Sequence, residues 1–88
     1  GYFISKNKIT LTPEMDIDRL LLKVEDKYKK QPHTTIDGLK IEFDKEWVHL
    51  RRSNTEPIIR IYSEGNSETI ADNLANKIIT DIKEILNL

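Results

Sequence analysis

The middle of the chain carries three segments in which apolar and polar residues alternate, with turn-forming residues between them. The segments span residues 34–43, 47–51 and 58–63. Alternation of this kind is typical of strands that bury one face and expose the other. Asp37-Gly38 interrupts the first segment, and this pair favours a tight hairpin turn because positive backbone angles suit both residues. We therefore predict a run of antiparallel strands, which begins with a short strand at residues 34–36.

Alternation also assigns the side chains of residues 47–51 to the two faces of their strand. Val48 and Leu50 fall on the apolar side, which faces the core. Trp47, His49 and Arg51 fall on the opposite side, where Arg51 points towards the loop that follows. An interdomain contact and partial burial beneath lysine stems explain Trp47 equally well.

Two further segments carry apolar residues at helical spacing, one on each side of the strand region. The first apolar stripe is Ile17, Leu20, Leu21, Val24 and Tyr28, and the second is Ile70, Leu74, Ile78, Ile82 and Ile85. The first helix starts after Thr12 or, one turn later, at the competing cap Asp16, and it ends before Pro32. The second helix starts at Asn66 or Ser67, which can both cap it.

The order of these elements limits the fold. A short strand with Ile9 and Leu11 on one side precedes the first helix. Both helices must bury an apolar stripe, and the apolar face of the sheet needs a cover. The simplest arrangement is an α+β fold: an open two-layer sandwich in which both helices cover one face of an antiparallel sheet of about four to five strands.

Composition limits the classes of function. The 88 residues suffice for one small domain with a modest core. A net charge of −1 argues against nucleic-acid binding that depends on phosphate neutralisation. No apolar run approaches the ~20 residues that span a bilayer, and the absence of cysteine excludes disulfides and thiolate metal sites. We therefore expect no nucleic-acid partner, no membrane contact and a cytoplasmic location.

The most distinctive stretch is R-R-S-N-T-E-P-I-I-R at residues 51–60, because it holds three of the four arginines of the chain. Arginine presents a planar fork of donors that pairs with two oxygens of a phosphate or carboxylate. The residues Ser53, Asn54 and Thr55 favour turns, and such a turn points backbone N–H groups into a concave nest for an anion. We predict a phosphate-binding loop between two strands. The alternative is a β-turn with solvated arginines.

This loop resembles the signature loop of the α-D-phosphohexomutases, which are the phosphoglucomutases, phosphomannomutases and phosphoglucosamine mutases. The matching residues are R-x-S-N-T-E-P-x-x-R at positions 51–60, followed by Tyr62 and Glu64. The resemblance covers essentially the whole chain but only the last of four domains, which has a plan like that of the TATA-binding protein. It implies that residues 1–88 are one C-terminal phosphate-binding domain of a larger enzyme. Residues 1–7 are interpreted as a tag remnant and an interdomain hinge.

The resemblance also implies a role for each residue of the loop. Arg51 is expected to be the main phosphate clamp. Ser53, Asn54 and Thr55 are expected to donate hydrogen bonds to the substrate phosphate from side chains and backbone. Arg60, in the next strand, contacts the same phosphate or supports the loop.

Two neighbours of the loop are expected to support it. Glu56 turns away from the phosphate, because like charges repel, and orients Arg51 or Arg60. His49 reaches the mouth of the loop or is an ordinary surface histidine. Arg52 is expected to point to solvent and is not part of the predicted site. No residue of the chain is expected to be catalytic, because the sequence shows no Ser-His-Asp arrangement and no Walker loop. No metal site is expected either, because two histidines without a spaced carboxylate do not form one.

For the parent protein, the resemblance implies an intramolecular phosphotransferase that interconverts hexose 1-phosphate and hexose 6-phosphate through a bisphosphate. The catalytic phosphoserine and the Mg²⁺ belong to other domains, so this domain alone is expected to hold the non-reacting phosphate and close the cleft. The expected partners are glucose, mannose or glucosamine phosphate and the other domains of the same chain.

Two other classes of function remain open at this point. One is a stand-alone module that binds phosphate or an acidic ligand. The other is a sheet that binds single-stranded RNA, for which only Trp47 and Tyr62 are candidate exposed aromatic residues.

Overall fold

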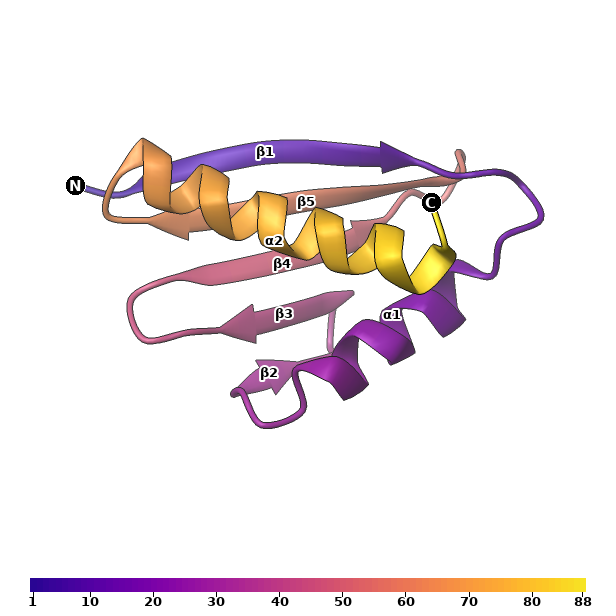
Figure 1. The fold of residues 1–88 in the computed structure, drawn as a ribbon, viewed down its shortest axis with the longest axis horizontal. Helices are drawn as coiled ribbons and strands as arrows, with labels where there is room; N and C mark the ends of the chain where they lie inside the picture. Colours follow the sequence, from indigo (N-terminus) through magenta and orange to yellow (C-terminus); the bar gives the residue numbers. More distant parts are fainter.

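The computed structural model describes residues 1–88, in which five strands and two helices follow one another (Figure 1). The strands are β1 (Phe3–Thr10), β2 (His33–Thr34), β3 (Leu39–Glu42), β4 (Trp47–Arg52) and β5 (Ile58–Gly65). The helices are α1 (Ile17–Lys27) and α2 (Glu68–Leu86). Neither helix combines the length and the apolar character that a bilayer-crossing segment requires.

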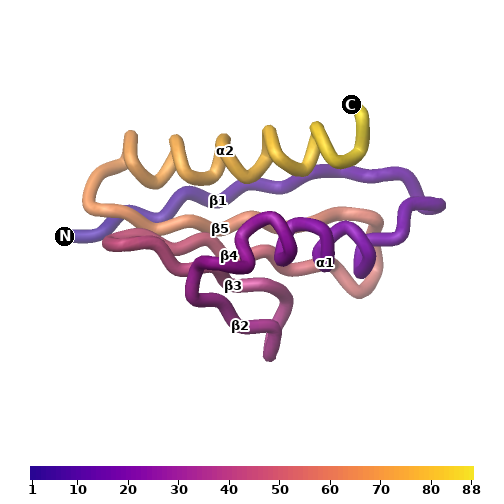
Figure 2. Tube along the Cα trace, turned by 60° about the horizontal axis from the view of Figure 1, so that its bottom comes forward, coloured from indigo at the N-terminus to yellow at the C-terminus, as the bar shows by residue number.

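All five strands form one antiparallel sheet in the order β1-β5-β4-β3-β2. Helix α2 packs along β1 and β5, and it also contacts α1. Figure 2 shows α2 as a separate layer above β1 and β5. The opposite face of the sheet has no helix over it, and we call it the open face.

One hydrophobic core fills the space between the sheet and the helices. Its strand residues include Leu39, Ile41, Val48, Leu50, Ile59 and Ile61, and its helix residues include Leu20, Val24, Leu74, Ile78 and Ile82. Val48 and Leu50 are fully buried, so the predicted core face of this strand is confirmed. Because both helices contribute to the same core, the predicted α+β sandwich is confirmed, with five strands in its sheet.

Polar caps set where the two helices begin. Asp16 is the N-cap of α1, and its carboxylate accepts a hydrogen bond of 3.0 Å from the Arg19 amide. The later of the two predicted starts is therefore correct, whereas Thr12 belongs to a turn that precedes the helix. Ser67 caps α2 through a hydrogen bond of 3.1 Å from the Ile70 amide to its hydroxyl oxygen.

The hairpin between β2 and β3 is longer than the predicted tight turn. Strand β2 ends at Thr34, so the strand predicted at residues 34–36 is wrong beyond that residue, and Ile36 is 95% exposed. Only Gly38 in this turn has a positive φ, of 68°, whereas a two-residue type I′ turn needs positive φ at both central residues. A Cβ atom at Gly38 would clash with the carbonyl oxygen of Leu50, so the turn packs closely against the backbone of β4.

Strand β1 pairs with β5 along its whole length, from Phe3 opposite Gly65 to Thr10 opposite Ile58. Residues 3–7 therefore belong to the sheet. Their interpretation as part of a tag remnant and an interdomain hinge stays a prediction.

Candidate functional site

The predicted loop, residues 53–57, joins β4 to β5 and is held by backbone hydrogen bonds at both ends. The Ser53 amide donates to the Ile58 carbonyl oxygen at 3.1 Å, and the Ile58 amide donates to the Glu56 carbonyl oxygen at 2.8 Å. A third bond of 2.7 Å runs from the Leu11 amide, just after β1, to the Pro57 carbonyl oxygen. Backbone hydrogen bonds therefore hold the loop against the start of β5 and against the residue that follows β1.

The loop curls around the hydroxyl group of Ser53. The Ser53 Oγ atom accepts hydrogen bonds of 3.2 Å from the amides of both Thr55 and Glu56, and it lies 3.3 Å from the Thr55 hydroxyl oxygen. Two consecutive backbone N–H groups thus donate to the side chain of Ser53, which fixes the shape of the loop in the manner of a serine turn. Asn54 and Thr55 are exposed, so their side chains are free to meet a ligand.

Arg51 and Arg60 lie directly opposite each other on β4 and β5. Residues that pair in this way project to the same face of a sheet, with Cβ atoms about 4.5–5.5 Å apart. Val48 and Leu50 alternate with Arg51 along β4, so the two arginines lie on the open face, and both are exposed. The structure therefore brings together the two arginines that the sequence predicts for the site.

Arg52 does not join this pair. It alternates with Arg51, and its guanidinium group lies 2.7 Å from the Asp18 carboxylate of α1. Its side chain is therefore on the helix side of the sheet, in a partly exposed ion pair. This geometry agrees with leaving Arg52 out of the predicted site, although the side chain contacts α1 and does not extend freely into solvent.

The acidic partner of Arg51 is Asp37, a residue that the sequence analysis did not assign to the site. Its carboxylate lies 3.3 Å from the Arg51 guanidinium group, and His49 Nε2 lies 2.5 Å from its carbonyl oxygen. Leu39 pairs with Leu50, so the turn that precedes Leu39, with Asp37 in it, lies next to Arg51. The sequence held a signal for this contact, because the Asp37-Gly38 turn starts the strand that comes immediately before the strand of Arg51.

The two supporting residues differ in what they contact. His49 contacts the Asp37 backbone and thereby joins the β2–β3 turn to β4. Glu56 contributes its backbone to the loop but forms no ion pair with either arginine of the site. Its predicted role in orienting Arg51 or Arg60 stays a prediction.

Trp47 lies on the open face, where the neighbouring side chains cover part of its ring. Its indole N–H donates to the Glu64 carboxylate at 2.5 Å, and the Lys40 ammonium group lies 4.9 Å from the ring centroid. These contacts agree with the interpretation that lysine stems bury the ring in part. An interdomain contact through Trp47 stays a prediction.

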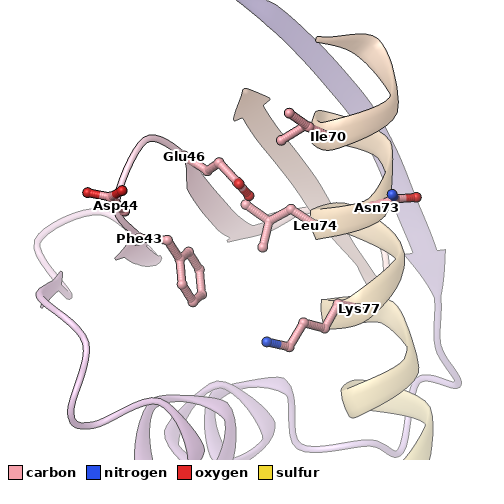
Figure 3. Close-up of a pocket in the computed structure, with 7 residues that line it drawn as sticks. All are labelled: Phe43, Asp44, Glu46, Ile70, Asn73, Leu74 and Lys77. Atoms are coloured by element: carbon pink, nitrogen blue, oxygen red, sulfur yellow. The ribbon is translucent and has the colours of Figure 1, made fainter. Parts of the chain in front are cut away.

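A different hollow, of about 400 Å³, lies between the β3–β4 turn and α2 (Figure 3). Its lining includes Phe43, Leu74 and Lys77, and the Lys77 ammonium group lies 5.7 Å from the centroid of the Phe43 ring. Strand β4 runs from this turn to the loop, so the hollow and the loop lie at opposite ends of the strand. Asp44 and Glu46 also line the hollow, and their negative charge disfavours a phosphate there.

Histidine and carboxylate side chains do not gather into a metal site. No group of three or more such side chains in residues 1–88 is arranged to hold a metal ion. The paired guanidinium groups of Arg51 and Arg60 are of the kind that can form forked hydrogen bonds to an anion.

Fold and site together define a two-layer α+β domain that presents an arginine-flanked loop at one end of its sheet. The family described as phosphoglucomutase/phosphomannomutase, C-terminal domain, matches residues 8–81, and the chain belongs to this family. The resemblance carried by the loop is therefore confirmed.

Curated relatives are similar to the chain over most of its length. A phosphoglucosamine/phosphogalactosamine mutase of Sulfurisphaera tokodaii is 37% identical over 79 residues, which are 88% of this chain and 17% of the relative. A probable phosphoglucosamine mutase of Pyrococcus horikoshii is 32% identical over 89 residues, 97% of this chain and 20% of the relative. A phosphoglucomutase/phosphomannomutase of Thermococcus kodakarensis is 47% identical over 57 residues, 62% of this chain and 12% of the relative. The chain thus spans about a fifth or less of the length of these relatives.

Proposed function

We propose that this chain is the domain that binds the substrate phosphate, and closes the cleft, in a phosphohexomutase. The observation that carries the proposal is the cross-strand pair of Arg51 and Arg60 beside a loop in which Asn54 and Thr55 are exposed. Membership of the mutase family supports it, because the relatives are named as mutases of sugar phosphates.

The proposed reaction of the parent protein interconverts hexose 1-phosphate and hexose 6-phosphate through a bisphosphate. One phosphoryl group is transferred to the sugar from a group outside this chain, and the other is returned. Arg51, Arg60, Ser53, Asn54 and Thr55 would hold the phosphate that is not reacting at that moment. Holding this remote group turns binding energy into orientation of the sugar hydroxyl that reacts.

Closure of this domain over the substrate would also keep water away from the reacting phosphoryl group. The isolated chain would bind but would not catalyse, because the group that exchanges the phosphoryl group with the sugar would lie outside this chain. We place the Mg²⁺ of the parent enzyme outside residues 1–88, since no acidic cluster in this chain would hold it. The other domains of the same chain are the proposed partners, in a cytoplasmic enzyme.

The proposed ligands are glucose, mannose and glucosamine phosphates. The names of the relatives favour a hexosamine phosphate as the first ligand to test. The sugar itself would be recognised mainly outside this chain, since the proposed contacts of the loop are all with the phosphate.

Titration of the ¹⁵N-labelled chain with glucosamine 6-phosphate tests the proposal by NMR. We expect the amide signals of residues 51–60 to shift, and Arg51→Ala to weaken binding about 10- to 100-fold, because it removes charge-assisted hydrogen bonds worth ~1.5–3 kcal/mol. Arg19→Ala, which removes an arginine from α1, is the matched control and should bind as the unaltered chain does. Equal affinity in the Arg51 variant would contradict the proposal. In the full-length enzyme, Arg51→Ala should raise KM and lower kcat.

A further inference from the structure

We propose that Lys8 on β1 is a third cationic contact for the bound phosphate, so that Lys8, Arg60 and Arg51 form one phosphate-binding row across three adjacent strands. The inference rests on the proposed function and extends its site beyond the loop and its two arginines. It adds a residue from β1, which lies outside the signature loop at residues 51–60.

The register of the sheet places the three residues in line. Lys8 pairs with Arg60 between β1 and β5, and Arg60 pairs with Arg51 between β5 and β4. Directly paired residues project to the same face, with neighbouring Cβ atoms about 4.5–5.5 Å apart. All three side chains are exposed on the open face. Because lysine and arginine side chains are long and flexible, one phosphate group can meet cations from adjacent strands.

Strand β1, which carries Lys8, is also hydrogen-bonded next to the loop, and this fixes the loop relative to the row. The Leu11 amide, three residues after Lys8, donates to the Pro57 carbonyl oxygen at 2.7 Å. Thr10 pairs with Ile58, the residue that follows the loop. Strands β1 and β4 therefore lie on the two sides of β5 beside the loop. Lys8 is on the β1 side of the proposed anion site, and Arg51 is on the β4 side.

The charge of the row is only partly neutralised within the chain. Arg51 has Asp37 as its partner, whereas Lys8 and Arg60 form no ion pair. Like charges that face each other across strands destabilise a sheet. A bound dianion would remove this repulsion, which gives the row a physical reason to take up a phosphate.

Apart from Asp37, which pairs with Arg51, the acidic residues of the open face lie away from the row. Glu64 sits four residues after Arg60 on β5, and its carboxylate already accepts the Trp47 indole N–H. Glu42 is the partner of Trp47 in the sheet and so lies at the same far end. Between them and the row stand Lys6 and Tyr62, which also pair with each other. Positive charge is therefore concentrated at the end of the sheet that carries the loop.

A surface depression of about 300 Å³ accompanies these cations on the open face. Its lining includes Lys8 and Arg60 together with Lys6 and Tyr62, two of which offer ammonium groups and one a phenolic hydroxyl. A phosphate held by the row would thus have donors on the β1 side as well as on the loop side. Such a set of cationic and hydroxyl donors suits the phosphate group of a phosphate monoester, whatever the rest of the ligand is.

The experiment compares Lys8→Gln with the unaltered chain in an NMR titration with glucosamine 6-phosphate, and with inorganic phosphate as the second probe. Glutamine keeps most of the stem of lysine, so the variant removes the charge and little packing. We expect Kd to rise about three- to tenfold for both probes, as for the loss of one of several charge contacts. Lys8→Arg should restore the affinity. The loss in the Gln variant should shrink as salt is added.

Matched controls separate this inference from the proposed function. Lys23→Gln removes an exposed lysine of α1, in the other layer, and should leave Kd unchanged. If Arg51→Ala abolishes binding while Lys8→Gln binds as the unaltered chain does, the inference about Lys8 is overturned and the proposed function stands. If the unaltered chain binds neither probe, both fail. Urea unfolding midpoints within error of each other show that the variants are folded.

Discussion

The two arginines of the proposed site differ in how far their charge is already neutralised. Arg51 faces the Asp37 carboxylate at 3.3 Å, with 51% and 63% of the two side chains exposed. Ion pairs as exposed as this contribute only ~0–1 kcal/mol. A phosphate dianion at the proposed site would therefore compete with Asp37 for the Arg51 guanidinium group, and we expect Asp37 to be a weak internal competitor.

Asp37→Asn is expected to tighten the binding of glucosamine 6-phosphate about two- to fivefold, because it removes a competing charge of that modest size. The His49 contact uses the backbone carbonyl oxygen at position 37 and survives the change. NMR or calorimetric titration of the variant measures the effect. Weaker binding would show that Asp37 mainly orients Arg51, which is the opposite role.

His33 is expected to make the stability of the domain depend on pH. Its Nδ1 atom lies 2.8 Å from the Gln31 carbonyl oxygen and its Nε2 atom 3.1 Å from the Glu25 carboxylate. Both partners are acceptors, so only the protonated ring donates to both. The carbonyl of Gln31, with a further contribution from Glu25, raises the pKa of His33 above its ordinary value of 6.5.

This shift predicts the sign of the pH effect. Because the folded pKa is the higher one, the His33 contribution to stability is fully present below about pH 6.5 and is lost as pH rises through the folded pKa. His33→Gln should therefore lower the free energy of unfolding at pH 5.5 and leave it nearly unchanged at pH 9. Urea unfolding at the two pH values measures this, and an equal loss at both would contradict the assignment.

At the scale of whole elements, one polar cluster joins the two helices. The Tyr28 hydroxyl, just after α1, donates to the buried Asp81 carboxylate of α2, and the Lys27 ammonium group lies 2.8 Å from the same carboxylate. Burial, together with the Asp81 carboxylate, raises the pKa of the Tyr28 hydroxyl. The helices therefore meet through a hydrogen-bonded network as well as through apolar packing.

Asp81→Ala is expected to lower the free energy of unfolding by ~1–3 kcal/mol, because it leaves the Tyr28 hydroxyl in the core without a partner. Tyr28→Phe, which removes the hydroxyl itself, should cost only ~0.5–1.5 kcal/mol. Asp72→Ala, at an exposed position of the same helix, is the control. Chemical unfolding measures all three, and a larger loss for Tyr28→Phe than for Asp81→Ala would contradict this account.

For the whole molecule, the important feature is that a single core supports a site at its edge. Residues of both helices and of the sheet pack into one cluster, while the loop and the row of Lys8, Arg60 and Arg51 lie outside it. Loss of a site residue should therefore change ligand affinity with little effect on folding, whereas loss of a core residue should change both.

We expect the 88-residue chain to unfold in one cooperative transition and to show no mutase turnover. Circular dichroism should follow the backbone, and the fluorescence of Trp47, the only tryptophan, should follow β4. The two urea transitions should coincide, as they do in two-state unfolding. Separate transitions would contradict the single core, and turnover by the pure chain would contradict the prediction that no residue of this chain is catalytic.

Patterns that act over three or four residues were readable in the sequence. Alternation placed Val48 and Leu50 on the core face, and the hydroxyl before α2 identified Ser67 as one of two candidate caps. The residues of the loop pointed to the mutase family, which the comparisons then showed. These signals are local, because a cap or a side-chain period depends only on near neighbours.

Other features depended on which distant segments pair. The opposition of Arg51 and Arg60 follows from a register in which a slip by one residue would turn Arg60 to the other face. The contact of Asp37 with Arg51, and the pairing of Lys8 with Arg60, require β3 and β1 to pack on either side of the β4–β5 hairpin. Local propensity cannot specify such neighbours, because the burial of the helices and strands in one shared core decides which strands meet.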